Sequence, residues 1–148
     1  ASNLISSARF RTTGGERPLE HHLATKKKQD SSAPIRILLV DDDVLLVSCQ
    51  AAVLESYGHE VTAVSDSTHA LTLMRGNPSH FDIVITDLVM PVIDGIELSA
   101  AISSLRPDLP IIMLTATPPE HGLGYGIRKL LTKPAPSREV HRAILEFV

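Results

Sequence analysis

The chain has 148 residues, of which 43% are apolar, and a formal net charge of −3. This length supports one domain with a hydrophobic core and is too short for two ordinary domains. No apolar run approaches the roughly 20 residues of a membrane-spanning helix, and the N-terminus lacks a signal-peptide pattern, so we expect a cytoplasmic location without membrane insertion. The single cysteine, Cys49, has no partner for a disulfide or a zinc site, and we expect it to be a small buried residue.

Charge divides the chain into two parts. Residues 1–34 hold six basic and three acidic groups, show no sustained periodicity and end in a Ser-Ser-Ala-Pro stretch, which is typical of a disordered tail or linker. Residues 35–148 hold eight basic and fourteen acidic groups. An acidic domain of this kind is not expected to bind nucleic acid directly.

From residue 35 onward, short apolar runs alternate with amphipathic stretches, a pattern typical of a parallel sheet with helices on both faces. The expected strands are 36–40, 60–64, 83–86, 111–114 and 129–132. The first helix, expected at about 43–57 with Asp43 as its N-cap, places Leu45, Cys49, Ala52 and Val53 on one face. Further helices are expected from Ser67 as a cap to about residue 76, after Gly95 with Arg106-Pro107 closing the helix, and at 137–148.

The segment between the last two strands is unusual. Only seventeen residues separate Thr115 from Lys133, and two prolines and three glycines lie among them. Because proline and glycine inside a helix cost roughly 3 and 1 kcal/mol relative to alanine, we expect a shortened or irregular fourth helix. A short turn or mobile loop should follow Pro119.

Polar residues follow four of the expected strands: Asp41 and Asp42, Asp87, Thr115 and Lys133. In an open parallel sheet of order 2-1-3-4-5, the ends of strands one and three meet where the strand order reverses, and ligands bind there. Three carboxylates brought together repel unless a cation compensates them, and Mg²⁺ suits such an all-oxygen set. A lysine and a threonine hydroxyl beside them fit a phosphoryl group. The pattern therefore predicts phosphoryl transfer, with Asp87 as the nucleophile.

The same residues, taken with Met90-Pro91, Asp94-Gly95, Ala116 and Pro134, resemble the receiver domain of two-component response regulators over residues 36–148. The resemblance implies a flavodoxin-like, doubly wound α/β fold with a five-stranded parallel sheet. It also implies a signalling domain rather than an enzyme with a separate substrate, in which Asp87 accepts a phosphoryl group from a histidine kinase or a histidine phosphotransfer protein.

The resemblance further implies roles for individual residues. Asp41 and Asp42 would hold Mg²⁺ together with Asp87 and the backbone carbonyl of Val89. Lys133 would pair with the acceptor carboxylate and then with the phosphoryl group, and Thr115 would hydrogen-bond a phosphoryl oxygen. The bond between Lys133 and Pro134 would be cis.

Two positions depart from the family pattern. Leu130 stands where many receivers carry Tyr or Phe, which speaks against an aromatic switch, and the face around the fourth helix looks remodelled. Val89 stands where the family often carries a side chain that orients water. Because valine cannot do so, we hypothesise slow self-dephosphorylation.

Other functions compete with this interpretation. A haloacid dehalogenase-like phosphatase also uses an aspartate after an apolar strand, but it needs an acidic pair beyond the lysine, where only Glu139 and Glu146 occur. A receiver-like interaction module without phosphorylation is a second alternative. Flavin binding is disfavoured, because three aspartates follow the first strand where a phosphate-binding loop would stand. The domain could be a stand-alone regulator or the receiver of a hybrid histidine kinase.

Overall fold

The computed structural model describes residues 33–121 and 123–148. Residues 34–148 form one compact unit. The tail or linker predicted for residues 1–34 lies outside the described residues except for its last two positions, and it stays a prediction.

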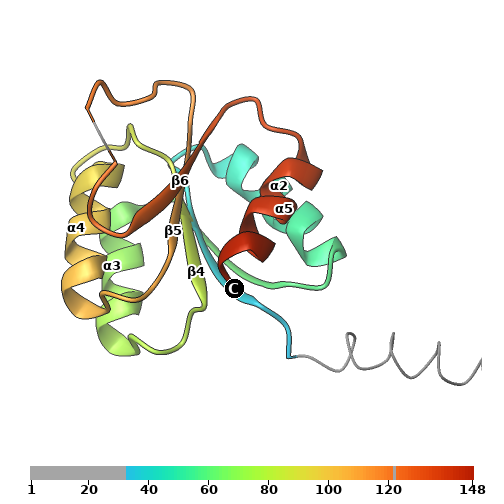
Figure 1. Ribbon diagram of the computed structural model, residues 1–148, viewed down its shortest axis with the longest axis horizontal. Coiled ribbons are helices and arrows are strands. Elements are labelled where there is room, and N and C mark those ends of the chain that lie inside the picture. The colour runs from blue at the N-terminus through green and yellow to red at the C-terminus, as the bar shows by residue number, and fades with distance from the viewer. Residues whose placement is uncertain (1–32, 122) are drawn as a thin grey trace, which may run out of the picture. The chain divides into compact units, whose positions relative to one another are not determined.

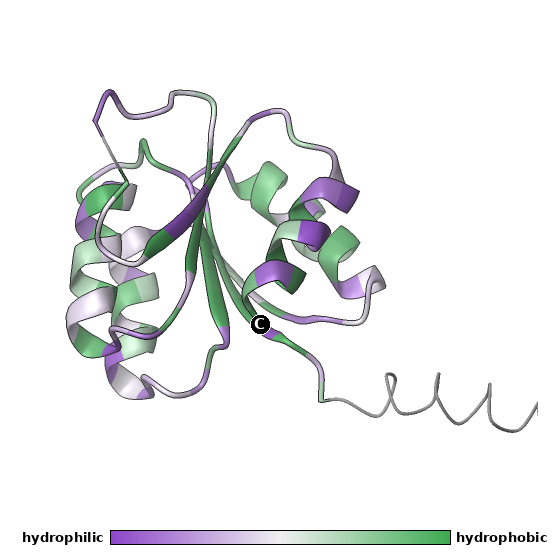
Figure 2. Cartoon of the chain, viewed as in Figure 1, coloured by the Kyte–Doolittle hydropathy of each residue, from purple (hydrophilic) through white to green (hydrophobic). Residues whose placement is uncertain are grey.

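Five parallel strands form a single sheet: β2 (Arg36–Val40), β3 (Glu60–Val64), β4 (Ile83–Thr86), β5 (Ile111–Thr115) and β6 (Ile127–Thr132). Their order is β3-β2-β4-β5-β6, which is the predicted 2-1-3-4-5 in chain order. The strands β4 and β5 are buried throughout, and Figure 2 shows the apolar character of the strands in the middle of the molecule. Burial on both faces explains why these strands read as continuous Ile, Val and Leu runs.

Four helices cover the sheet: α2 (Val44–Ser56), α3 (Ser67–Gly76), α4 (Gly95–Leu105) and α5 (Ser137–Phe147). The helices α3 and α4 lie on one face and α2 and α5 on the other (Figure 1). Between β5 and β6, none of the described residues 116–121 and 123–126 is helical, as predicted; the mobility of this connection stays a prediction. Within the described ranges, no helix is long and apolar enough to span a membrane.

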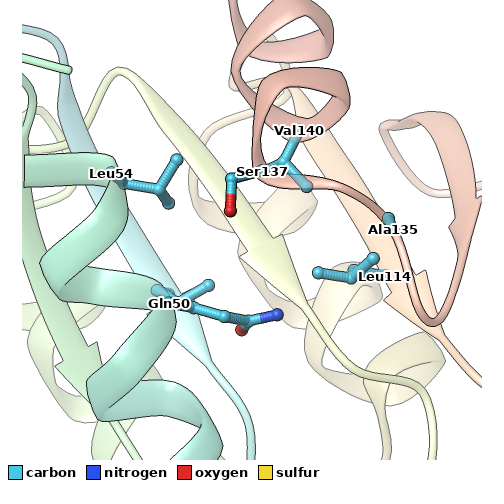
Figure 3. Close-up of a pocket in the computed structure, with 7 residues that line it drawn as sticks. Gln50, Leu54, Leu114, Ala135, Ser137 and Val140 are labelled. Atoms are coloured by element: carbon cyan, nitrogen blue, oxygen red, sulfur yellow. The ribbon is translucent and has the colours of Figure 1, made fainter. Parts of the chain in front are cut away.

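The face under α2 and α5 has its own core, built from Ile37, Leu39, Ile83, Ile85, Ile112 and Leu114 of the sheet and from both helices. A small cavity of about 40 Å³ remains between the two helices (Figure 3). The side-chain oxygen of Gln50 is buried there without a hydrogen-bond partner among the described residues. The space has room for only a few waters and its walls are largely aliphatic, so it is no candidate for a phosphoryl site.

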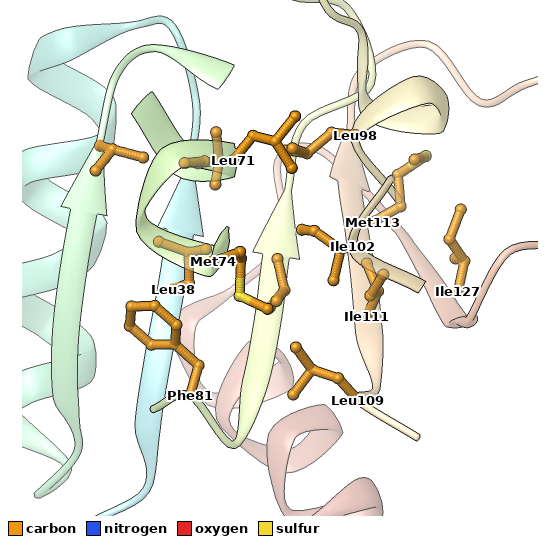
Figure 4. Packing of buried hydrophobic residues seen from close by; sticks show 14 of the residues in the cluster. Leu38, Leu71, Met74, Phe81, Leu98, Ile102, Leu109, Ile111, Met113 and Ile127 are labelled. Atoms are coloured by element: carbon orange, nitrogen blue, oxygen red, sulfur yellow. The ribbon is translucent and has the colours of Figure 1, made fainter. Parts of the chain in front are cut away.

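The opposite core packs α3 and α4 against the sheet. Figure 4 shows Leu71 and Met74 of α3 and Leu98 and Ile102 of α4 gathered over the strands, and all four are at most 7% exposed. Burying such side chains contributes about 1.5–3 kcal/mol each. The core fixes the start of α4 relative to β4, and so the loop between them.

Aspartate side chains cap the starts of α2, α3 and α4, whereas α5 begins after Pro136 without a side-chain cap hydrogen bond. Asp43 accepts a hydrogen bond from the Leu46 amide (3.0 Å), as predicted. Asp94 and Glu97 form a reciprocal capping box at α4. The predicted cap Ser67 is wrong by one residue: Asp66 caps α3 by accepting from the Thr68 amide (2.9 Å), while Ser67 is buried and is the first helical residue.

The predicted buried face of the first helix is also wrong. Val47, Ala51 and Leu54 are the buried residues of α2, whereas Leu45 is 74% exposed and Cys49 is exposed rather than buried. The predicted partners Ala52 and Val53 are exposed as well. Because α2 carries apolar residues on nearly every side, periodicity alone could not select the face that packs.

A pair of histidines links the turn before β3 to α5. His59 Nε2 and His141 Nδ1 lie 2.9 Å apart, and the Tyr57 ring stacks on the His141 ring with centroids 4.2 Å apart. His59 is only 9% exposed. Its burial, and secondarily the nearby His141, lower the pKa of His59 below the ordinary 6.5.

This lowered pKa predicts acid sensitivity of the fold. Below about pH 6.5 the unfolded chain takes up a proton at His59 that the folded chain excludes. The free energy of unfolding should therefore decrease as the pH is lowered, by at most about 1.4 kcal/mol per pH unit. Above that pH the histidine is neutral in both states and contributes no slope. Urea unfolding between about pH 7.5 and about pH 5 should show a shallower decline for His59→Gln than for wild type. The control His69→Gln, at an exposed position, should keep the wild-type slope; equal slopes in all three proteins would contradict this origin.

Candidate functional site

The acidic residues meet because two neighbouring strands end side by side. The strand β2 pairs in parallel with β4, with Val40 opposite Thr86, so the next residues, Asp41 and Asp87, emerge together at the carboxyl edge. One carboxylate oxygen each from Asp41, Asp42 and Asp87 lies within 4.8 Å of the others. Asp41 is buried and Asp42 is exposed, so the cluster opens to solvent on one side.

Backbone amides orient two of the three carboxylates. Asp41 Oδ1 accepts from the Asp43 amide (2.9 Å), and Asp87 Oδ1 accepts from the Leu88 amide (2.7 Å). The other oxygen of each carboxylate faces the Lys133 ammonium, at 2.6 Å from Asp41 Oδ2 and 3.2 Å from Asp87 Oδ2. Lys133 therefore bridges the ends of β2 and β4.

Burial alone would lower the pKa of Lys133, but the hydrogen bond to Asp41 and the charges of Asp41 and Asp87 outweigh it and raise the pKa above the ordinary 10.5. The lysine is thus a fixed positive charge at neutral pH. Its amide donates to the Thr115 carbonyl (2.9 Å), and the Lys133-Pro134 bond is cis, as expected.

Thr115 ends β5 at the same edge of the sheet. It is 1% exposed, and its Oγ1 accepts from the Thr117 amide (3.2 Å). Thr132, which precedes Lys133, is its partner in the ladder. The structure therefore brings Asp41, Asp42, Asp87 and Lys133 into one cluster and sets Thr115 beside it. The Thr115 side chain bonds the Thr117 amide and not these carboxylates.

The loop from Asp87 to Gly95 borders the cluster. Val89 is 61% exposed, and Val92 takes a left-handed backbone conformation, with φ of 71°, which is unusual for a β-branched residue. An open hollow beside this loop is lined by Asp42, Ser65, Asp66, Ser67, Met90, Pro91 and Val92. Asp42 is the member of the acidic cluster that lines this hollow.

Sequence reasoning missed one contact. It used Asp94-Gly95 only for the family resemblance, yet the start of α4 lies directly against the backbone of Asp87, and a Cβ built on Gly95 would stand 2.2 Å from the Asp87 carbonyl oxygen. The available signal was the glycine itself, since glycine at the first position of a helix is a poor helix former and calls for a packing reason.

The donor set fits Mg²⁺. It consists of carboxylate oxygens from two strand ends, partly open to solvent, and Mg²⁺ prefers one or two carboxylates together with waters and phosphate oxygens. No cysteine or histidine belongs to the group, which disfavours a zinc-type centre. Asp41, Asp42 and Asp87 are the residues that would hold the ion.

The acids lie at the topological switch point of a parallel α/β sheet, where such folds bind their ligands, and the lysine that follows the last strand joins them. The family model described as "Response regulator receiver domain" matches residues 37–145. The transcriptional regulatory protein TcrA of Mycobacterium tuberculosis is 36% identical over 104 residues, covering 68% of this chain and 40% of that protein. This chain thus spans less than half of that relative.

Solved structures agree. This chain is similar to a structure of the CheX–CheY–BeF₃–Mg²⁺ complex from Borrelia burgdorferi. The TM-score is 0.73 and the identity 27%, over 81% of this chain and 94% of that one. The receiver domain of the hybrid histidine kinase CckA is similar with a TM-score of 0.65 and 27% identity, over 75% of this chain and 96% of that one. The chain belongs to the family of response regulator receiver domains of two-component signalling. Members of this family interact with histidine kinases or phosphotransfer partners.

The cluster predicts how stability responds to loss of the lysine. In Lys133→Met the carboxylates of Asp41 and Asp87 lose their counter-charge, so the free energy of unfolding without metal should fall by up to about 3 kcal/mol. Added Mg²⁺ should restore part of this loss, because a cation again compensates the acids. The control Lys129→Met removes an exposed pair with Glu146 and should cost at most about 1 kcal/mol. Urea unfolding of wild type and of both variants, with and without Mg²⁺, gives the free energies of unfolding. Equal losses in the two variants would contradict the assigned role of Lys133.

Proposed function

We propose that this domain accepts a phosphoryl group on Asp87 from a phosphohistidine of a kinase or phosphotransfer protein, in the presence of Mg²⁺ and in the cytoplasm. One observation carries the proposal: the Asp87 carboxylate lies in a cluster with two further acids and 3.2 Å from the Lys133 ammonium. A nucleophilic carboxylate, a metal-binding acid pair and a fixed cation are what phosphoryl transfer requires.

In the proposed reaction, a carboxylate oxygen of Asp87 forms a bond to phosphorus while the bond from phosphorus to the donor imidazole nitrogen breaks. The product is an acyl phosphate, and the donor histidine keeps the nitrogen lone pair. Asp41, Asp42, Asp87 and the Val89 carbonyl would hold Mg²⁺, which would supply positive charge to neutralise the phosphoryl oxygens. The Lys133 ammonium, already between Asp41 and Asp87, can reach a phosphoryl oxygen, and Thr115 can donate a hydrogen bond from the end of β5.

The structure gives no support to the phosphatase alternative. Glu146, one of the two acids after Lys133, pairs with Lys129 at 2.7 Å, and Glu139 lies in the first turn of α5, where it is exposed. Neither belongs to the acidic group. A signalling domain without turnover of a separate substrate is therefore our proposal, and the intact cluster favours it over an interaction module that no longer accepts phosphate.

Phosphorylation at Asp87 can be tested with acetyl phosphate and Mg²⁺. Wild type should gain the mass of one phosphoryl group, and Asp87→Asn should gain none, because the nucleophilic carboxylate is gone. The control Asp94→Asn should be phosphorylated like wild type, since asparagine also caps helices well. Intact mass spectrometry measures the gain. A phosphoryl group on Asp87→Asn would exclude Asp87 as the acceptor.

The exposed start of α2 is the surface that we propose contacts the donor protein. Val44 and Leu45 are 63% and 74% exposed, and they directly follow Asp43 in the chain, next to the acidic cluster. Exposed apolar residues beside a reactive centre are typical of a binding surface.

Leu45→Arg should therefore slow transfer from a phosphorylated histidine phosphotransfer domain by about tenfold or more, while phosphorylation by acetyl phosphate stays at the wild-type rate. The matched control Leu145→Arg changes a leucine of α5 that is 52% exposed and should transfer normally. Rates from rapid-quench labelling decide the point. Equal slowing with both donors would instead indicate damage to the site.

The side chain of Val89 predicts a long-lived phosphoryl group. It is exposed beside the cluster and, being apolar, cannot orient an attacking water. Val89→Asn should shorten the phosphoryl lifetime by about tenfold, at the low end of what a group that positions water contributes. Val92→Asn, in the same loop and 84% exposed, serves as the control and should keep the wild-type lifetime. An unchanged lifetime in Val89→Asn counts against this explanation.

A further inference from the structure

Gly95 lies closer to the acceptor than a side chain would permit. A Cβ built on it would stand 2.2 Å from the Asp87 carbonyl oxygen, 2.9 Å from Leu88 Cα and 3.0 Å from the Asp87 carbonyl carbon. All three neighbours are backbone atoms, and ordinary contacts of a Cβ are 3.4–4 Å. A side chain at this position could not be accommodated by rotation of a neighbouring side chain, so the backbone after Asp87 would have to move.

The peptide group that would move also orients the acceptor. Its carbonyl, on Asp87, accepts from the Thr86 hydroxyl (2.9 Å), and its N–H, on Leu88, donates to Asp87 Oδ1 (2.7 Å). Because a peptide is planar, its carbonyl and N–H turn together. The Gly95 amide adds a bond to the next carbonyl, that of Leu88 (2.7 Å). A side chain that displaced the carbonyl of this peptide would therefore also displace the N–H that holds the Asp87 carboxylate.

We propose that Gly95 is a positioning residue for Asp87: its missing side chain lets the Asp87–Leu88 peptide stay in the orientation that holds the carboxylate. This inference rests on the proposed function for its consequence, the rate of phosphorylation, but the geometry stands independently. Thr86 supports the same peptide from its carbonyl side, and its side chain is fully buried.

Helix formation alone predicts the opposite result for a substitution. Alanine is favoured over glycine within a helix by about 1 kcal/mol, so a glycine needed only for the turn into α4 would tolerate alanine or gain from it. Gly76, at the other end of a helix, has no atom within 4 Å of an added Cβ and serves as the matched control.

The test compares Gly95→Ala, Gly76→Ala and Thr86→Val with wild type. In Gly95→Ala the rate of phosphorylation by acetyl phosphate and Mg²⁺ should fall by roughly 10- to 100-fold, as a displacement of about 1 Å can do. Gly76→Ala should keep the wild-type rate. Without metal, the Leu88 amide proton signal in Gly95→Ala should move toward its position in Asp87→Ala, where the carboxylate acceptor is missing. Thr86→Val should move the signal in the same direction.

A wild-type rate and an unmoved Leu88 signal in Gly95→Ala would overturn the inference. Should Gly95→Ala fail to fold, Thr86→Val decides: a shifted Leu88 signal supports the role of the peptide, and an unshifted one refutes it. Failure of the proposed function looks different, because wild type itself would gain no phosphoryl group on Asp87. The Leu88 signals of the variants would still support or refute the positioning role in that case.

Discussion

The parallel pairing of β2 with β4 is the constraint on which the site depends. It places Val40 opposite Thr86, and the residues that follow, Asp41 and Asp87, leave the sheet side by side. Leu38 and Val40 pack in the core under α3 and α4, and Ile37 and Leu39 in the core under α2 and α5, so close packing on both faces of β2 fixes the position of the carboxylates. Packing energy thus holds charges together that would otherwise repel.

Lys133 compensates part of that repulsion and directly follows β6, the strand at one edge of the sheet. The last strand, β6, pairs with β5, and the bond from the Lys133 amide to the Thr115 carbonyl extends this ladder to the site. The lysine then contacts both Asp41 and Asp87. One ammonium shared by carboxylates from two strands leaves net negative charge, which suits a divalent cation and, with it, an incoming phosphoryl group.

Much of this was predictable from the sequence, because buried parallel strands are apolar throughout and the residues after them are polar. The strand positions followed from that contrast, and the cluster of Asp41, Asp42, Asp87 and Lys133 followed once the order 2-1-3-4-5 was assumed for this type of sheet. The buried face of α2 did not, since a helix that is apolar nearly all round gives no periodic signal, and the exposure of Cys49 was missed with it. The contact of Gly95 with the Asp87 backbone is a relation between two main-chain segments, which no side-chain pattern encodes.

The central claim is that Asp87, and no other acid of the cluster, carries the phosphoryl group. Borohydride reduces an acyl phosphate of aspartate to homoserine, so reduction of the phosphorylated protein followed by peptide mass spectrometry identifies the acceptor directly. Homoserine at position 87 alone is the predicted result. Homoserine at position 41 or 42, or a phosphoryl group that resists reduction, would contradict the account.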